Sequence, residues 1–383
     1  MLLNNNRHVY GHYLVEDKIY YDKAAALIAA KSISNVQWKM FNGEVDNIDW
    51  SVEPTDDLES LYARRVRQLR NDYDWLALHY SGGSDSQNVL ETFIKNGIHL
   101  DEVILRGTNL DEEPLDPNNP IYSYTEVKHL AYPLAKIVKE RHMPHLKITV
   151  VDHTDISKQW FIRNPRWYEE YLFVDDPFNI IRADYDLLSP HLINMVQSGK
   201  KVGHILGIDK APVYVDDEGI YIQFRDQPFA RHVMPRTIER GLDYYIELFT
   251  FHPGTVKIIA KEAHVIKNWL LARPENLAGW KHEAEHHIWT RRYEDFVSNI
   301  LWKRMFPMFF KIEKAHSKKD IIWPHHLALC QDPTEDFMKI YLKGMWEIQR
   351  QLPRNALIKN KILKGGYQYF ETSKYYIHRF EVL

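Results

Sequence analysis

The feature that most constrains this chain is the hexapeptide SGGSDS at 81–86 and the two elements that flank it. A short apolar segment at 75–80 precedes the hexapeptide and predicts a buried strand. The residues from 87 onward carry apolar side chains at helical spacing as far as Gly97, a residue type that often ends helices. A strand, a glycine-rich turn and a helix in this order direct backbone N–H groups and the positive end of the helix dipole to one point. The sequence therefore predicts an anion-binding loop at 81–86.

The hexapeptide resembles the SGGxDS loop of the PP-loop (N-type) ATP pyrophosphatases. That family includes asparagine synthetase, GMP synthetase, NAD synthetase, the tRNA-lysidine enzyme and several tRNA thiolases. The resemblance extends over 75–226 and is specific only at 81–86. It implies an adenine nucleotide α-hydrolase-like domain that uses ATP and Mg²⁺ as cofactors. The alternative is a turn of Ser, Gly and Asp that only links a strand to a helix.

The length of the chain predicts more than one domain, because 383 residues exceed what one typical hydrophobic core supports. We expect a small α+β N-terminal unit at 1–72, an α/β domain with the loop at 73–230, and a mostly helical C-terminal domain at 231–383. The resemblance implies that the α/β domain is a parallel, doubly wound sheet of the HUP type. A hydrophobic content of 45% is typical of a soluble globular protein.

Local patterns divide the N-terminal unit into four elements. Alternation over 8–21 predicts a β-hairpin, and 36–41 predicts a further strand. An alanine-rich helix is expected at 22–31, and a second helix at 56–72 with Thr55 as its possible cap.

The rest of the chain changes from strand–helix alternation to helices. An irregular aromatic stretch is expected from Trp160 to Tyr171, and a kink or break at Pro133. The expected strands of the α/β domain are 75–80, 102–106, 146–151 and 203–206, with a hairpin at 213–215 and 220–224. The expected helices of that domain are 87–96, 124–141 and 188–198, and those of the C-terminal region are 242–250, 255–272, 293–312 and 336–351.

The resemblance also implies which residues meet at the site. In the family the first loop holds the pyrophosphate of ATP, the end of the second strand borders the adenosine, and a later loop completes the phosphate site. Asp85 would hold Mg²⁺, and Asp209 could be a second ligand, because Mg²⁺ combines few carboxylates with phosphate oxygens. The nucleotide-binding residues implied are Ser81, Gly82, Gly83, Ser84, Asp85, Ser86, Arg106, Gly107, Gly207, Asp209 and Lys210.

The loop lacks the lysine of a Walker motif, and no G-x-x-x-x-G-K-[ST] pattern occurs in the chain. Another cation must therefore stabilise a departing pyrophosphate. Lys210 is the first candidate and forms the expected catalytic pair with Asp85; Arg225 comes next, and then the lysine pair 200–201. The alternatives for the second loop are a solvated lysine and a turn-stabilising Asp209.

The single cysteine, Cys330, excludes several related chemistries. It permits neither an intrachain disulfide nor a cysteine-rich zinc site. The family's thiolating members generally use cysteine pairs and its deazaguanine-forming branch uses four cysteines, so both are disfavoured. Leu2 stands where an N-terminal nucleophile glutaminase would expose a cysteine. Ammonia or an amine would therefore come from solution or from a separate donor protein.

Other patterns compete with the loop for a functional role. Residues 282–286 match the H-E-x-x-H zinc pattern, but their charged flanks favour a solvated helix face. His325, His326 and Cys330 lie among apolar residues, which favours packing. The stretch 359–379 mixes basic and aromatic side chains, which suits nucleic-acid binding or packing on the core. The acidic residues 111–113 face either the site or solvent.

We therefore expect an asparagine-synthetase-like ligase. A substrate oxygen would attack the α-phosphorus of ATP, Mg-pyrophosphate would leave, and the adenylate would activate a carboxylate or amide carbon for a nitrogen nucleophile. The alternatives are a PP-loop enzyme that modifies a nucleobase or tRNA, and a nucleotide-binding sensor or complex subunit without turnover. The expected partner is a small-molecule substrate, with oligomerisation and nucleic-acid binding possible although the net charge of −3 gives no general attraction to nucleic acid. The lack of a long apolar run or signal peptide predicts a cytoplasmic protein.

Overall fold

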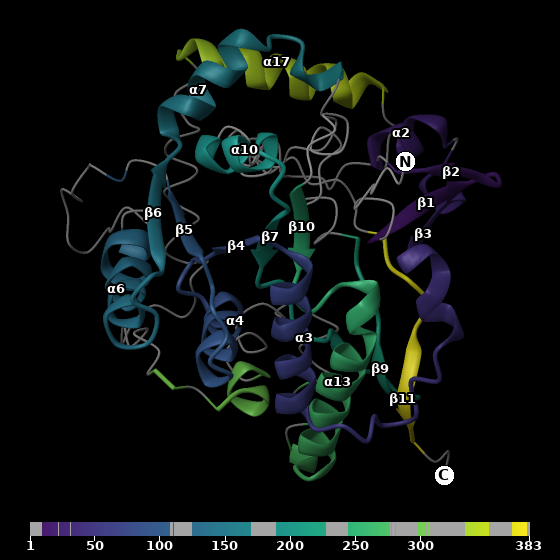
Figure 1. Cartoon of the computed structure of the whole chain (residues 1–383). Helices are drawn as coiled ribbons and strands as arrows, with labels where there is room; N and C mark the ends of the chain where they lie inside the picture. The colour runs from purple at the N-terminus through teal and green to yellow at the C-terminus, as the bar shows by residue number, and fades with distance from the viewer. Residues whose placement is uncertain are drawn as a thin grey trace.

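A computed structural model gives the fold, which is α/β and is built on a five-stranded parallel sheet (Figure 1). Two three-stranded sheets accompany it. The structure describes residues 10–21, 23–30, 32–107, 110, 125–169, 189–226, 244–275, 277, 280, 297–303, 305–306, 334–351 and 370–380.

The central sheet has the strand order β10-β7-β4-β5-β6, and all its strands are parallel. Within this sheet the chain first forms the central strand β4 and then adds β5 and β6 toward one edge. It then returns to add β7 and β10 on the other side of β4. This arrangement is compatible with a Rossmann-like fold. The four strands predicted within the α/β domain are confirmed. The strands are β4 (Trp75–His79), β5 (Glu102–Gly107), β6 (Lys147–Asp152), β7 (Val202–Leu206) and β10 (Tyr244–Leu248).

The helix predicted at 242–250 is wrong, because Tyr244–Leu248 is strand β10 and pairs in parallel with β7. Residues 245–248 are all buried, including Glu247, which pairs with Arg65, so the segment has no exposed polar face that would mark its period. Periodicity alone cannot assign such a run to a helix or a strand. The sheet is therefore completed by a segment from the predicted C-terminal domain.

Helices cover both faces of the sheet. On one face, α3 (Leu58–Asp72), α4 (Ser84–Lys95) and α6 (Tyr132–Arg141) share a core with Leu76 and Leu78 of β4. On the other face, α10 (Pro190–Gln197) packs in the core that contains Ala77. The alternation of Leu76, Ala77 and Leu78 between the two cores follows from the two-residue period of a strand. Each face of β4 thus has its own hydrophobic core.

Several helix boundaries differ from those predicted. Helix α3 is capped by Asp57, whose side chain accepts a hydrogen bond from Ser60 N at 2.8 Å, and not by Thr55. Helix α4 begins at Ser84, inside the hexapeptide, and not at 87. The predicted 124–141 helix starts with the π-helical turns Thr125–Ala131 and continues as α6, with its proline in the first turn.

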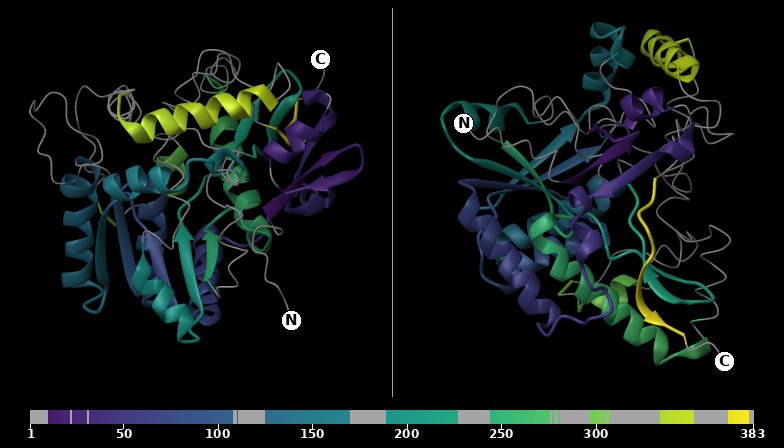
Figure 2. Two further views of the ribbon diagram at one scale, coloured as in Figure 1. Left: turned by 90° about the horizontal axis from the view of Figure 1, so that it is seen from above. Right: turned by 90° about the vertical axis from the view of Figure 1, so that its right-hand side faces the viewer.

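Helix α7 (Thr154–Arg163) was not predicted, and its last turn overlaps the start of the aromatic stretch that was expected to be irregular. His153 is the N-cap residue of this helix, and the Asp152 carboxylate before it accepts hydrogen bonds from Thr154 N at 2.9 Å and from Thr154 Oγ1 at 2.7 Å. Helix α17 (Asp336–Gln351), which was predicted, lies beside α7 (Figure 2). Helix α13 (Val256–Leu271) was also predicted, and it packs against α3.

The two small antiparallel sheets lie outside the central one. The first joins β1 (Gly11–Val15), β2 (Lys18–Tyr20) and β3 (Val36–Met40) beside helix α2 (Lys23–Ala29), as predicted. The second joins the predicted hairpin to a strand that was not predicted; its members are β8 (Val213–Val215), β9 (Gly219–Ile222) and β11 (Tyr375–Arg379).

A buried ion pair connects these outer sheets. Lys23 Nζ lies 2.7 Å from Asp226 Oδ2, and the same carboxylate accepts hydrogen bonds from Tyr13 Oη at 2.9 Å and Phe370 N at 3.2 Å. The N-terminal unit, the β8–β9 hairpin and the chain's C-terminal end are therefore joined at one carboxylate. Removing one member would leave a charge buried without compensation, which is strongly unfavourable.

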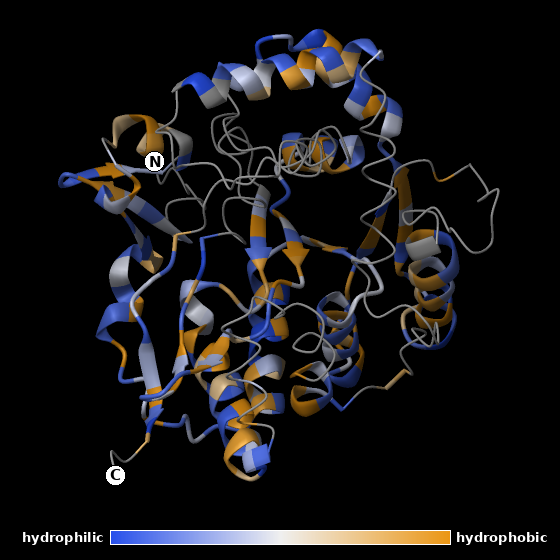
Figure 3. Ribbon diagram, turned by 180° about the vertical axis from the view of Figure 1, so that it is seen from behind, coloured by the Kyte–Doolittle hydropathy of each residue, from blue (hydrophilic) through white to orange (hydrophobic). Residues whose placement is uncertain are grey.

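Hydropathy follows the layers of the fold. The central strands are largely hydrophobic, whereas the helices around them carry both hydrophobic and hydrophilic residues (Figure 3). Within the described part of the chain, no helix is long and apolar enough to span a membrane.

Candidate functional site

The loops that follow β4 and β7 meet at the point where the strand order reverses. In open parallel sheets, ligands bind beyond the carboxyl ends of the strands at such a point. The contact is between backbones, because a Cβ atom on Gly207 would lie 2.6 Å from Ser86 N and 2.7 Å from Ser86 Cα. Only glycine at 207 allows this approach. The structure therefore brings together the two loops that the sequence singled out.

The hexapeptide at 81–86 is held by its own serines. Ser86 Oγ accepts a hydrogen bond from Ser81 N at 3.3 Å and donates to Gly83 O at 3.1 Å, while Ser81 Oγ accepts from Gly83 N at 3.3 Å. Gly82 has a φ of 70°, a conformation that favours glycine. Helix α4 starts at Ser84, so the N–H groups of its first turn lie within the loop and have no acceptor inside the helix. The predicted strand–loop–helix is confirmed, and its geometry suits an anion.

Lys210 reaches from the second loop to the first. Its side chain is buried, and Nζ lies 2.6 Å from Asp85 Oδ1 and 3.7 Å from Asp209 Oδ1. The ring of Trp302 covers the same ammonium, with its centroid 5.4 Å from Nζ. The solvated lysine that the sequence left open as an alternative is thus wrong. A fixed positive charge stands at the start of α4.

A buried carboxyl group lies behind this lysine. Glu262 on α13 accepts a hydrogen bond from Ala211 N at 2.8 Å and one from the Tyr62 hydroxyl, which in turn accepts from Trp302 Nε1 at 2.8 Å. Burial raises the pKa of Glu262 to about 8, although the hydrogen bonds and the charge of Lys210 oppose the shift. Glu262 therefore anchors the backbone beside Lys210.

No local pattern in the sequence indicates this network. Tyr62, Glu262 and Trp302 lie on three segments far apart in the chain, and each occupies an ordinary helical or loop pattern. Only their packing around Ala211 and Lys210 gives them a role at the site.

Arg106 and Gly107 end strand β5, where the family resemblance implies that the adenosine would lie. Nearby, His79 Nε2 and His204 Nδ1 are 3.0 Å apart in the buried face of the sheet. Burial lowers the pKa of His204 to about 3, and the charge of Arg106 adds to the shift. Arg106 therefore lies close enough to this histidine pair to act on it electrostatically.

The remaining cation candidates make other contacts. The lysines at 200–201 precede β7, at the amino end of the strand, and Lys201 Nζ lies 5.2 Å from the ring centroid of Tyr73. These lysines were wrongly considered for the phosphate site, because the loops lie at the opposite end of β7. Arg225 pairs with Glu371, with 2.8 Å between Nε and Oε1.

Some competing patterns lie outside the described residues. These are the acidic residues at 111–113, the H-E-x-x-H pattern at 282–286 and the segment with His325, His326 and Cys330. Within the described ranges, no group of three or more His, Cys, Asp or Glu side chains could hold a metal ion.

The fit of the predicted Mg²⁺ depends on the two carboxylates near Lys210. The side chains of Asp85 and Asp209 are 31% and 52% exposed, so both can meet a ligand from solution. Two carboxylates are too few for a site made by protein alone, but they suit Mg²⁺ that also binds phosphate oxygens. The residues therefore fit a magnesium–nucleotide complex better than a free ion.

Fold and site together define an α/β protein with a Rossmann-like sheet and a helix-initiating loop at the point where its strand order reverses. None of the family models searched matches the chain, and no match was found among the curated proteins.

Proposed function

We propose that this protein binds ATP with Mg²⁺ at the 81–86 loop and cleaves it to AMP and pyrophosphate while adenylating a small-molecule substrate. The activated carboxylate or amide carbon is then attacked by a nitrogen nucleophile, as in an asparagine-synthetase-like ligase. The observation that carries the proposal is the position of Lys210, a buried lysine 2.6 Å from the loop carboxylate of Asp85. It supplies the cation that the loop itself lacks.

Each part of the site has a distinct task in this reaction. The N–H groups of the 81–86 loop and the start of α4 bind phosphate oxygens. Mg²⁺, when bound with ATP near Asp85 and Asp209, supplies charge that neutralises the phosphates. Lys210, held against Asp85, supplies positive charge beside the departing pyrophosphate, and its burial strengthens this electrostatic effect because little water screens it.

Glu262 is a positioning residue in this proposal. Its carboxyl group binds Ala211 N, the backbone group next to Lys210, at 2.8 Å. It therefore fixes the direction from which the lysine enters the site.

The nucleobase or tRNA alternative has less support. In the described part of the basic–aromatic stretch, Lys374 pairs with Asp216 at 2.8 Å and Arg379 pairs with Glu218 at 2.9 Å. Ile377 of the same strand is buried. These charges are already balanced within the second small sheet, which favours packing over phosphate contacts.

The proposal is tested by incubating the protein with ATP, Mg²⁺, ammonium and a panel of carboxylic acids, and by separating the nucleotides by chromatography. AMP and pyrophosphate are the expected products, whereas ADP and phosphate would contradict the proposal. ATP that stays bound and intact with every acid would favour the sensor alternative.

Two lysine-to-methionine variants test whether the reaction depends on Lys210. Lys210→Met is expected to reduce turnover by roughly 10²- to 10³-fold, the typical effect of removing one transition-state donor. Lys201→Met, the same change at the other end of β7, is expected to leave turnover unchanged. Equal rates for the two variants would remove Lys210 from the mechanism.

A further inference from the structure

Two side chains of helix α13 form a lysine–histidine pair. Lys267 Nζ lies 2.8 Å from His264 Nδ1. The residues are three positions apart, a spacing that places side chains next to each other on a helix surface. The His264 side chain is fully buried, whereas Lys267 is only half-buried. A small reagent from solution can therefore reach the amine but not the imidazole.

The contacts of His264 fix the tautomer of its ring. Nε2 lies 3.0 Å from Trp50 O, an oxygen that can only accept a hydrogen bond. Nε2 therefore carries the proton, and the neutral ring has its lone pair on Nδ1. Burial lowers the pKa of His264 and the charge of Lys267 adds to this shift, although the bond to Trp50 O opposes it. At neutral pH the ring thus presents a basic nitrogen to the amine.

The surroundings of Lys267 favour a neutral amine. Burial lowers the pKa of Lys267; Glu53 opposes the shift, and the charge of Lys261 adds to it. The Glu53 carboxylate is already bound by Lys261 at 2.6 Å and by Asn268 at 3.2 Å, so it compensates Lys267 only in part. A lysine that is partly desolvated and close to a second cation is an activated nucleophile.

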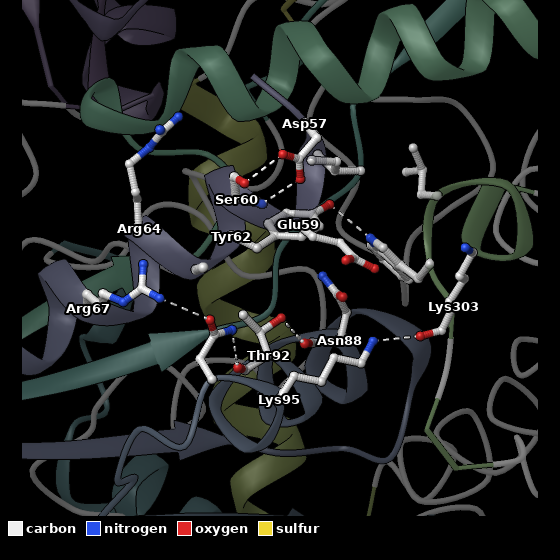
Figure 4. Close-up of a pocket in the computed structure, with 15 residues that line it drawn as sticks. Asp57, Glu59, Ser60, Tyr62, Arg64, Arg67, Asn88, Thr92, Lys95 and Lys303 are labelled. Atoms are coloured by element: carbon white, nitrogen blue, oxygen red, sulfur yellow. Dashed lines mark hydrogen bonds between the residues drawn. The ribbon is translucent and has the colours of Figure 1, made fainter. Parts of the chain in front are cut away.

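Lys95 provides a contrast in the cavity between α3 and α4 (Figure 4). This cavity has a volume of about 790 Å³ and a charged lining, but two of its cations are engaged within the protein. Arg67 donates to Asn96 Oδ1 at 3.4 Å, and Lys95 Nζ donates to Lys303 O at 2.6 Å. A backbone carbonyl accepts a hydrogen bond from an amine but does not take its proton, whereas an imidazole can. Only the Lys267 amine of these two lysines has a base beside it.

We propose that Lys267 is a site of covalent acylation by activated carboxylic acids, with His264 Nδ1 as the base. The donors are compounds in which an acyl group is bonded to a good leaving group, such as an acyl phosphate. The neutral amine attacks the acyl carbon, and a C–N bond forms. The bond from that carbon to the leaving group then breaks, and the leaving group departs with the bonding electrons. An uncharged amide remains on Lys267.

His264 acts when the amine nitrogen becomes positively charged during the attack. This nitrogen is a much stronger acid in the tetrahedral adduct than in free lysine, so an imidazole whose pKa is lowered can still accept its proton. Nδ1 is already in hydrogen-bonding contact with the nitrogen, at 2.8 Å. The proton then passes to solvent, and the ring returns to its neutral form.

The test uses acetyl phosphate as the acyl donor and the full-length protein at neutral pH. The protein is then unfolded and its remaining amines are labelled with deuterated acetic anhydride, so that mass spectrometry gives the reacted fraction of each lysine. Lys267 is expected to react at least about tenfold faster than Lys257, an exposed lysine of the same helix, because lowering a lysine pKa by one unit gives about tenfold more neutral amine. Lys95 is expected to react no faster than Lys257.

The variant His264→Gln tests the base. Glutamine keeps an N–H donor for Trp50 O but has no basic nitrogen. Acetylation of Lys267 is expected to slow by about tenfold, less than a positioned base usually contributes, because burial weakens this one. Lys257 is expected to react at its original rate, and a thermal melt checks that the variant is folded.

The variant Glu53→Gln tests the charges around the amine. It removes the carboxylate that opposes the pKa shift of Lys267, so the rate of acetylation at Lys267 is expected to rise at lower pH than in the natural protein. The Glu53 side chain is 34% exposed, so its replacement leaves the core intact. A pair with only a structural role would show neither this shift nor the faster reaction of Lys267.

Three results would overturn the proposal. These are acetylation of Lys267 no faster than that of Lys257, an unchanged Lys267 rate in folded His264→Gln, and a pH profile in Glu53→Gln that stays in place or moves to higher pH. If His264→Gln does not fold, the other two measurements decide. The inference goes beyond the proposed function and uses none of its residues or nucleotides, so failure of either proposal leaves the other standing.

Discussion

Lys210 Nζ lies 2.6 Å from Asp85 Oδ1, and this ion pair joins the loop after β7 to the first turn of α4. The lysine side chain is buried, whereas the aspartate is 31% exposed. The aspartate can therefore be hydrated when the lysine is removed, but the lysine cannot be hydrated when the aspartate is removed. Removing the aspartate should therefore destabilise the protein more than removing the lysine.

Asp85→Asn is expected to lower the free energy of unfolding by about 2–3 kcal/mol, because it leaves a buried ammonium poorly compensated. Lys210→Met should cost less, and the double variant less than the sum of the two. The measurement is urea unfolding of the four proteins as a double-mutant cycle. Additive effects would show that the two charges do not interact.

Gly207→Ala is expected to destabilise the protein by about 1–3 kcal/mol, as overpacking against a rigid neighbour does. The added Cβ would lie 2.6 Å from Ser86 N, a backbone atom that cannot rotate away. Gly254→Ala is the control, since its Cβ would meet its nearest atom, His252 Nδ1, at 3.4 Å. Urea unfolding compares the two variants, and equal stabilities would refute the close approach of the two loops.

Stability is expected to fall as the pH rises from about 4.5 to about 8, because Glu262 has an ordinary pKa of 4.5 and a pKa of about 8 in the folded protein. In this window the unfolded chain has lost a proton that the folded protein retains, at a cost of up to ~1.4 kcal/mol per pH unit. Glu262→Gln removes the titration and should flatten the dependence. Parallel pH profiles for the two proteins, measured by urea unfolding, would exclude a buried neutral carboxyl group.

The opposite trend is expected from His204, whose pKa falls from 6.5 to about 3 on burial. Below pH 6.5 the unfolded chain binds a proton that the folded protein does not, so the contribution of His204 to stability decreases as the pH falls toward 3. His204→Asn keeps a polar partner for His79 and should reduce this acid sensitivity. The exposed His99 provides the control His99→Asn, and thermal melts between these pH values give the comparison. An unchanged acid profile in His204→Asn would contradict the prediction.

Most of the helices and strands could be predicted from the sequence because they depend on residue types within short stretches of the chain. The residue types of 75–97 suffice to predict a strand, a glycine-rich turn and a helix in succession. The hairpins and the amphipathic helices can likewise be predicted from short stretches of sequence. The failures at 244–248 and 154–163 have a physical reason. A strand buried on both faces shows no period. The first residue of α7, Thr154, is held by Asp152 at the end of β6, a contact that depends on where the strand ends.

The sequence by itself determined the glycine-rich turn at 81–86 between a strand and a helix, and it singled out Lys210 as the candidate cation for the proposed site. Local residue types suffice for a loop, since serine hydroxyls and glycine φ angles act over a few residues. Only the tertiary structure decided that Lys210 is buried against Asp85, that Glu262 and Tyr62 stand behind it, and that a charged cavity lies between α3 and α4. These features arise between segments far apart in the chain, where burial and charge depend on the packing of the whole sheet.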